Sequence, residues 1–124
     1  MDIPTRIKIF GKDITIGYLP MPIPCDDGMA LGIADYTMNR ILLATKNEEG
    51  MKIPKSTIDE TFLHELAHWI FYFAGTEEMR SDEPLTDRVA NVLHELVPQL
   101  VKAQKTKKKK VTKKSIKKVV KESN

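Results

Sequence analysis

Hydrophobic and polar residues alternate near the start of the chain. Ile7 and Ile9, and then Ile14 and Ile16, follow a period of two on either side of Phe10-Gly11-Lys12-Asp13. Successive side chains of a strand point to opposite faces, so this alternation is typical of half-buried strands, and the glycine suits a tight turn. The pattern predicts a β-hairpin over roughly residues 3–18.

A second pair of apolar segments follows a stretch that is rich in proline and glycine. Residues 20–32 contain three prolines and two glycines, which remove ladder donors and break helices, and this composition predicts a loop. The segments 33–36 and 40–44 then flank Thr37-Met38-Asn39, which predicts a second hairpin that ends before Lys46.

After Pro54 the hydrophobic period changes from two to 3.6. The apolar positions that recur on one side of a helix are Ile58, Phe62, Leu66, Trp69 and Phe73. Ser56 or Thr57 is expected to cap this helix, because an acidic residue follows each of them at capping-box spacing. Gly75 is a suitable terminator. These signals predict a helix of about 18 residues.

A second helix is predicted after Pro84, which suits a first helical position. Its expected inner face consists of Leu85, Val89, Val92, Leu93, Leu96 and Leu100, and Pro98 is expected to kink or end it. The chain is therefore predicted to be an α+β domain, in which short hairpins precede two helices.

The net charge of +3 conceals two oppositely charged parts. Residues 1–101 hold nine Lys/Arg and sixteen Asp/Glu, a balance of −7, whereas residues 102–124 hold eleven lysines and one glutamate, a balance of +10. Repulsion among lysines opposes packing, so we expect a domain over 1–101 and a disordered tail over 102–124. The density of lysines in Lys105–Lys121 predicts non-specific binding to nucleic acid. The alternative is that this segment is solvated and only aids solubility.

Composition also bears on the expected cellular compartment and on which metal sites the chain can form. The chain has no apolar run of the roughly 20 residues that a membrane span needs, and its start lacks the pattern of a signal peptide. We therefore expect a cytoplasmic protein, or one in the host cytoplasm if it is phage-encoded. Cys25 is the single cysteine, which excludes an intramolecular disulfide and a cysteine-only metal site.

The strongest chemical signal lies within the first predicted helix. His64-Glu65-Leu66-Ala67-His68 matches the H-E-x-x-H pattern. Residues four apart share a helix face, so both imidazoles can point at one ion, while Glu65 projects beside its open coordination position. Imidazole ligands suit zinc, and three protein ligands plus water would form a catalytic rather than a structural site.

A carboxylate or histidine from the following segment is expected as the third ligand. The downstream candidates are Glu77, Glu78, Asp82, Glu83, Asp87, His94 and Glu95. Spacing favours Glu83, with Asp87 on the same helix face and able to orient a metal-bound imidazole. Asp87 or Glu95 as the ligand remains open, as does the possibility that Glu83 only stabilises the helix N-terminus.

The motif together with Glu83-x-x-x-Asp87 resembles the gluzincin branch of the zincin metallopeptidases, in particular the small minigluzincin-like proteins common in phages and mobile elements. The resemblance covers approximately residues 3–100 and includes a short strand before the motif helix. It implies that His64, His68 and Glu83 bind zinc, that Glu65 is the general base and that Asp87 supports a ligand.

These observations leave three classes of function open. The first is an intracellular zinc peptidase, in which zinc activates water and polarises the scissile carbonyl while Glu65 accepts the water proton and passes it to the leaving amine. Tyr36, Tyr72 or His94 is a candidate to stabilise the oxyanion. The second is a non-catalytic zinc-binding regulatory or interaction module, and the third a nucleic-acid-binding protein with structural zinc. Glu65 favours the peptidase, because a purely structural site needs no base.

Overall fold

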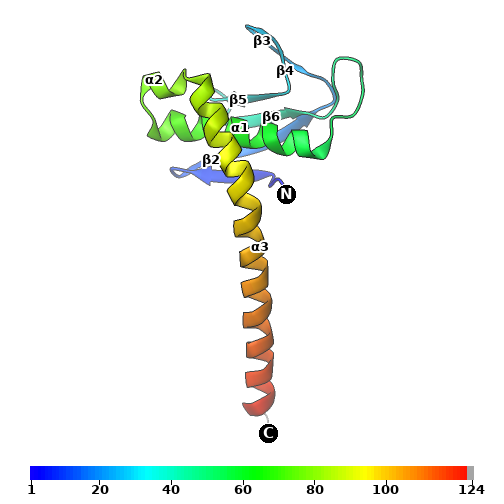
Figure 1. Cartoon of the computed structure of the whole chain (residues 1–124), viewed down its shortest axis with the longest axis vertical. Helices are drawn as coiled ribbons and strands as arrows, with labels where there is room; N and C mark the ends of the chain where they lie inside the picture. The colour runs from blue at the N-terminus through cyan, green and yellow to red at the C-terminus, as the bar shows by residue number, and fades with distance from the viewer. Residues whose placement is uncertain (123–124) are drawn as a thin grey trace. The chain divides into compact units, whose positions relative to one another are not determined.

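The computed structural model describes the backbone of residues 1–122 and the side chains of residues 1–105. It has the α+β organisation that the sequence predicts (Figure 1). The strands are β1 (Arg6–Ile9), β2 (Lys12–Leu19), β3 (Ile23–Cys25), β4 (Gly28–Ala30), β5 (Gly32–Asp35) and β6 (Arg40–Ala44). The helices are α1 (Lys55–Ala74), α2 (Glu77–Arg80) and α3 (Glu83–Glu122).

The main sheet has the strand order β1-β2-β6-β5. Strands β1 and β2 form the first predicted hairpin, and β5 and β6 form the second, both antiparallel. Between them, β2 runs parallel to β6. The order leaves β5 at one edge of the sheet, with β6 as its neighbour.

The first hairpin closes through a two-residue turn, because Ile9 pairs directly with Lys12. Phe10 and Gly11 both have positive φ, 49° and 76°. Such turns match the twist of the flanking strands, and glycine adopts positive φ without steric cost.

The prediction of a loop over residues 20–32 is wrong in part, because β3 and β4 form a small antiparallel hairpin there. Pro22 and Ile23 are buried at its base, whereas Pro24 and Cys25 are exposed. A two-stranded hairpin has free edges on both sides, so a proline that donates no hydrogen bond is tolerated in it.

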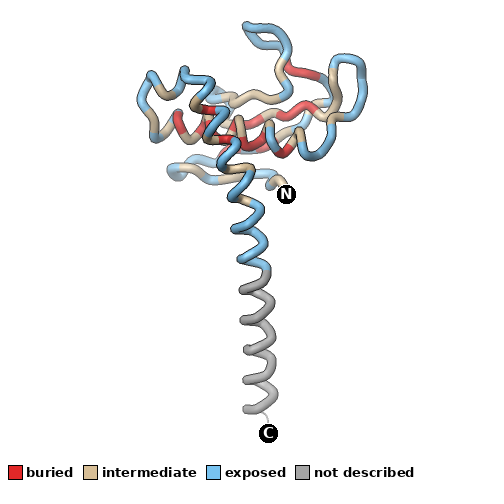
Figure 2. Tube along the Cα trace, viewed as in Figure 1, coloured by how far each residue is buried: buried red, intermediate tan, exposed pale blue. Residues whose placement is uncertain are grey.

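Helix α1 packs against β5 and β6 and forms the core with the inner face of the sheet (Figure 2). Its buried apolar residues are Phe62, Leu63, Ala67, Trp69 and Phe71, and those of the sheet include Ile14, Ile16, Ile41 and Leu43. The predicted stripe is therefore only partly correct, since Leu66 is half-buried while Leu63 and Ala67 face the core.

The ends of α1 differ in how well they were predicted. Gly75 follows the last helical residue, and its N–H donates to the carbonyl of Phe71, as expected of a terminator. The predicted caps Ser56 and Thr57 are wrong, because the helix already begins at Lys55, preceded by Pro54, and no side chain caps it.

Helix α3 begins at Glu83, with Pro84 as its second residue. Asp82 caps it, because Oδ1 of Asp82 accepts a hydrogen bond from the N–H of Leu85 at 3.0 Å. The predicted inner face is only partly correct: Leu85, Val89 and Leu93 are half-buried, whereas Val92, Leu96 and Leu100 are exposed.

The chain divides into two units within α3, Met1–His94 and Glu95–Asn124. The predicted domain over residues 1–101 stays a prediction. The helix continues past Pro98 to Glu122, so Pro98 does not end it. The predicted disorder of residues 102–124 stays a prediction. Side chains beyond residue 105 lie outside the described residues, so nucleic-acid binding through Lys105–Lys121 stays a prediction.

Within the part of the chain that the structure describes, none of the helices has the length and apolar character that crossing a membrane requires.

Candidate metal centre

Helix α1 places the two histidines of the motif side by side. His64 and His68 are one helical turn apart, and their ring centroids are separated by 4.8 Å. Both side chains are largely covered, with exposed fractions of 25% and 15%. Both imidazoles present Nε2 to the same carboxylate.

That carboxylate belongs to Glu83, at the first residue of α3. Its Oε2 lies 3.4 Å from Nε2 of His64, and its Oε1 lies 3.2 Å from Nε2 of His68. The short segment between the helices positions Glu83, because Asp82 fixes the start of α3 through its cap to Leu85.

His64, His68 and Glu83 could together hold a metal ion, since one ligand atom from each lies within 4.8 Å of the others. The two nitrogen–oxygen separations can be compared with a small tetrahedral ion, in which bonds of about 2.0–2.1 Å place ligand atoms about 3.3 Å apart. The observed contacts of 3.4 and 3.2 Å between Glu83 and the two histidines lie close to that spacing.

Asp87, one turn after Glu83 on α3, contacts the other ring nitrogen of His64. Its Oδ1 lies 2.9 Å from Nδ1 of His64, which places the carboxylate beside this ring nitrogen. A proton held on Nδ1 leaves the lone pair of Nε2 free to bind a cation. Glu83 therefore contacts both histidines, whereas Asp87 contacts His64 alone.

Burial also keeps His68 ready to bind a cation. Burial lowers the pKa of His68, and the neighbouring His64 lowers it further, against the opposing charges of Glu83 and Asp87. A lowered pKa favours neutral imidazole, which is the form that binds metals.

Glu65 is the most unusual ionisable group of the centre. It is only 7% exposed and accepts a hydrogen bond from the backbone N–H of Ala34 in β5. Burial raises the pKa of Glu65 from 4.5 to about 7, and the charge of Glu83 adds to this effect. A carboxyl group with a pKa near neutrality is suited to accept and return a proton.

Gly32 allows β5 to lie this close to Glu65. A Cβ atom at Gly32 would lie 2.5 Å from Cγ2 of Thr61 and 3.2 Å from Cγ of Glu65. Thr61 has little freedom to move away, because its hydroxyl donates to the carbonyl of Thr57. The absence of a side chain at Gly32 therefore helps to bring the backbone of Ala34 to the carboxylate.

Two adjoining hollows lie beside this centre, and both are lined by Gly32, His64 and Glu65. The first, of about 340 Å³, extends past Glu60 and Asp87. The second, of about 390 Å³, extends past His68, Glu83, Tyr36 and Arg80. Together they leave the motif accessible along the edge strand β5.

Comparison with protein-family models, with curated proteins and with solved structures found no match.

The structure separates the three residues that the sequence named for oxyanion stabilisation. Tyr36 lines the second hollow, and burial, with the charges of Glu65 and Glu83, raises the pKa of Tyr36 to about 12. Tyr72 stacks on the Tyr36 ring, with centroids 4.4 Å apart, so it supports that ring. His94 lines neither hollow.

The remaining candidates for the third ligand lie apart from the cluster. Among the described residues, Glu95 does not belong to the potential metal-binding group. Glu77 and Glu78 lie in the first turn of the short helix α2, and Asp82 caps α3.

Sequence reasoning missed Gly32, Ala34 and Arg80. No motif marks them, because their relation to Glu65 and Glu83 depends on how β5 and α2 approach α1.

Proposed function

We propose that this chain is a zinc-dependent peptidase in which His64, His68 and Glu83 bind the ion and Glu65 is the general base. The observation that carries the proposal is the position of Glu65, a buried carboxyl group beside three potential ligands and at the wall of an open groove. A site that only holds a metal needs the ligands but gains nothing from burying a fourth ionisable group.

Zinc is the ion that the donors favour. Two neutral imidazoles and one carboxylate form a ligand set typical of catalytic zinc, which keeps one coordination position open. When bound, zinc supplies a Lewis acid that polarises a peptide carbonyl and lowers the pKa of water.

The protein's own residues then carry the proton transfers. Glu65 takes a proton from the attacking water and delivers it to the leaving amine, and the Ala34 N–H holds the carboxylate in place between these steps. Asp87 maintains the His64 ring orientation through Nδ1. The Tyr36 hydroxyl, neutral at physiological pH, can donate a hydrogen bond to an oxyanion in the second hollow.

A peptide is the substrate class that suits the groove. Strand β5 is at the edge of the sheet, and Gly32, Ile33 and Ala34 line the second hollow. An extended peptide can hydrogen-bond to such an edge, which would place its backbone beside Glu65.

The test is metal-dependent cleavage of an unfolded protein, with the products mapped by mass spectrometry. Activity should disappear when a chelator removes the metal and should return with about one equivalent of zinc. His68→Ala should remain inactive after zinc is restored, whereas His94→Ala, the matched control outside the cluster, should behave as wild type.

A chain that binds one zinc but cleaves nothing in a broad panel of peptides and unfolded proteins would contradict the peptidase. That outcome would favour a zinc-binding regulatory or interaction module. Cleavage that survives His68→Ala would show that the activity comes from another protein in the preparation.

A further inference from the structure

Arg80 brings a positive charge to the second hollow that the metal centre does not use. It is the last residue of α2 and lines the same hollow as Glu83, His68 and Tyr36. Apart from the histidines, it is the only basic side chain among the described residues that line either hollow.

Two contacts hold the guanidinium of Arg80 at its Nε and its planar face. Its Nε donates to the carbonyl of Phe71 at 3.2 Å, and its Cζ lies 5.6 Å from the centroid of the Tyr72 ring. These contacts fix the direction of the side chain. Within residues 1–105, its terminal nitrogens form no ion pair or hydrogen bond, although Glu83 is three residues away.

Glu83 does not neutralise Arg80, because both of its oxygens face the histidines. The acidic residues Glu60 and Asp87 line the other hollow, on the opposite side of the motif. The two hollows therefore differ in their charged groups: the second has the guanidinium of Arg80 beside the carboxylate of Glu83, whereas the first has Glu60 and Asp87 and, in the described part of the chain, is lined by no lysine or arginine.

We propose that Arg80 is a specificity residue that binds a carboxylate of the substrate, either an acidic side chain or the free carboxyl terminus. The planar fork of arginine matches the two oxygens of a carboxylate, and such charge-assisted pairs are stronger than neutral hydrogen bonds. This inference rests on the proposed function in that the carboxylate belongs to a peptide positioned beside Glu65.

Three pools of peptides that differ only in their carboxylates test the proposal. One pool has Glu at a fixed position and an amidated end, the second has Gln there and an amidated end, and the third has Gln and a free carboxyl end. Cleavage is measured with the zinc-loaded wild-type chain. Binding is measured separately by fluorescence competition with the zinc-loaded Glu65→Gln chain, which holds the peptides without turning them over.

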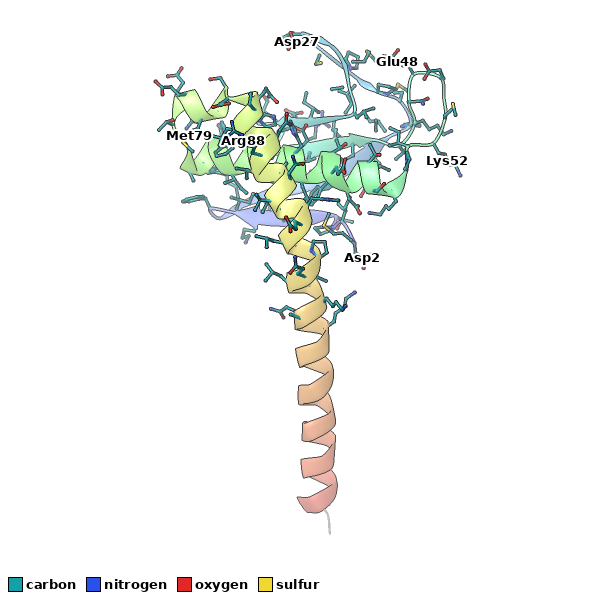
Figure 3. The ribbon with its side chains drawn as sticks, in the orientation of Figure 1. Asp2, Asp27, Glu48, Lys52, Met79 and Arg88 are labelled. Carbon is teal, nitrogen blue, oxygen red and sulfur yellow. The ribbon has the colours of Figure 1, made fainter. Side chains whose placement is uncertain are left out.

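We expect one of the carboxylate pools to be preferred over the neutral pool by about tenfold, the scale of one charge-assisted hydrogen bond. The preferred pool identifies the source of the carboxylate. Arg80→Gln should remove the preference in both assays, and Arg80→Lys should retain part of it. Arg88→Gln, at an arginine on α3 that lines neither hollow, should retain all of it (Figure 3).

Arg80 also packs on Tyr72, so circular dichroism checks the folding of each variant. If Arg80→Gln does not fold, Arg80→Met, which keeps an aliphatic stem, takes its place. Equal treatment of the three pools, or a preference that persists without the guanidinium, would overturn the proposal.

The two assays separate this proposal from the proposed function. Hydrolysis without a carboxylate preference refutes the role of Arg80 and leaves the peptidase intact. Carboxylate-selective binding that depends on Arg80, with no hydrolysis of any pool, refutes the peptidase and leaves the carboxylate site intact.

Discussion

Replacing Glu65 by glutamine should stabilise the metal-free protein at neutral and alkaline pH. The carboxyl group is buried, and this burial raises its pKa to about 7. Glutamine has nearly the same shape and can still accept the hydrogen bond from the Ala34 N–H. It is uncharged, so burying it avoids the free-energy cost of burying a carboxylate.

The sign and size of the effect follow from the two pKa values. The folded chain binds the Glu65 proton more readily than the unfolded chain, whose carboxyl has the ordinary value of 4.5. Wild type therefore loses stability relative to Glu65→Gln as the pH rises from about 4.5 through about 7. A tenfold change in an equilibrium constant is worth about 1.4 kcal/mol, so the full difference is about 3 kcal/mol, of which about 2 to 3 develop between pH 5 and pH 8.

Urea unfolding in the presence of a chelator measures this difference, with the fluorescence of the single, buried tryptophan Trp69 as the signal. Glu60→Gln, at an exposed position of the same helix, controls for the loss of a negative charge. Adding zinc should reduce the pH dependence, because a cation beside Glu65 favours the carboxylate. If wild type and Glu65→Gln differ by the same amount at pH 5 and pH 8, the reasoning about the buried carboxyl is refuted.

Three further predictions concern the ligands, the strand beside them and the basic segment. Zinc titration should give about one ion per chain, with affinity lost in His64→Ala and reduced more by Glu83→Ala than by Glu95→Ala; equal losses in the two glutamate variants would contradict the assignment of Glu83. Gly32→Ala should lower the free energy of unfolding by about 1–3 kcal/mol, because its Cβ would overlap Thr61, and unchanged urea unfolding would show that β5 yields easily. Replacing the ten lysines between Lys105 and Lys121 by glutamine should weaken DNA binding and flatten its salt dependence while leaving peptide cleavage unchanged, which anisotropy titrations at several salt concentrations would check.

Local sequence patterns were sufficient to predict the elements that carry the candidate metal centre. The two hairpins of the main sheet and the helix with the motif follow from periods of two and 3.6, and i, i+4 spacing brings His64 and His68 together. Glu83 and Asp87 are four residues apart near the start of one helix, so the sequence predicted that they share a face. In the structure both contact His64.

Features that depend on what packs against an element were not predictable in the same way. Val92, Leu96 and Leu100 share a helical period with buried residues, but periodicity does not reveal whether another element covers them, and they are exposed. The β3–β4 hairpin was missed because its prolines were read only as breakers, whereas Pro22 is buried at its base. The approach of Gly32 to Glu65, and of Arg80 to the hollow beside Glu83, arises from tertiary packing and leaves no motif.

The most direct test of the central claim is the rate of peptide cleavage by Glu65→Gln relative to wild type at equal zinc content. Both preparations are loaded with zinc, checked for about one ion per chain and compared on the same unfolded protein. The account predicts that Glu65→Gln keeps its zinc and its fold but loses about 10²- to 10⁴-fold in rate, the usual effect of removing a general base. Equal rates in the two chains would contradict the account, because Glu65 would then not be the base.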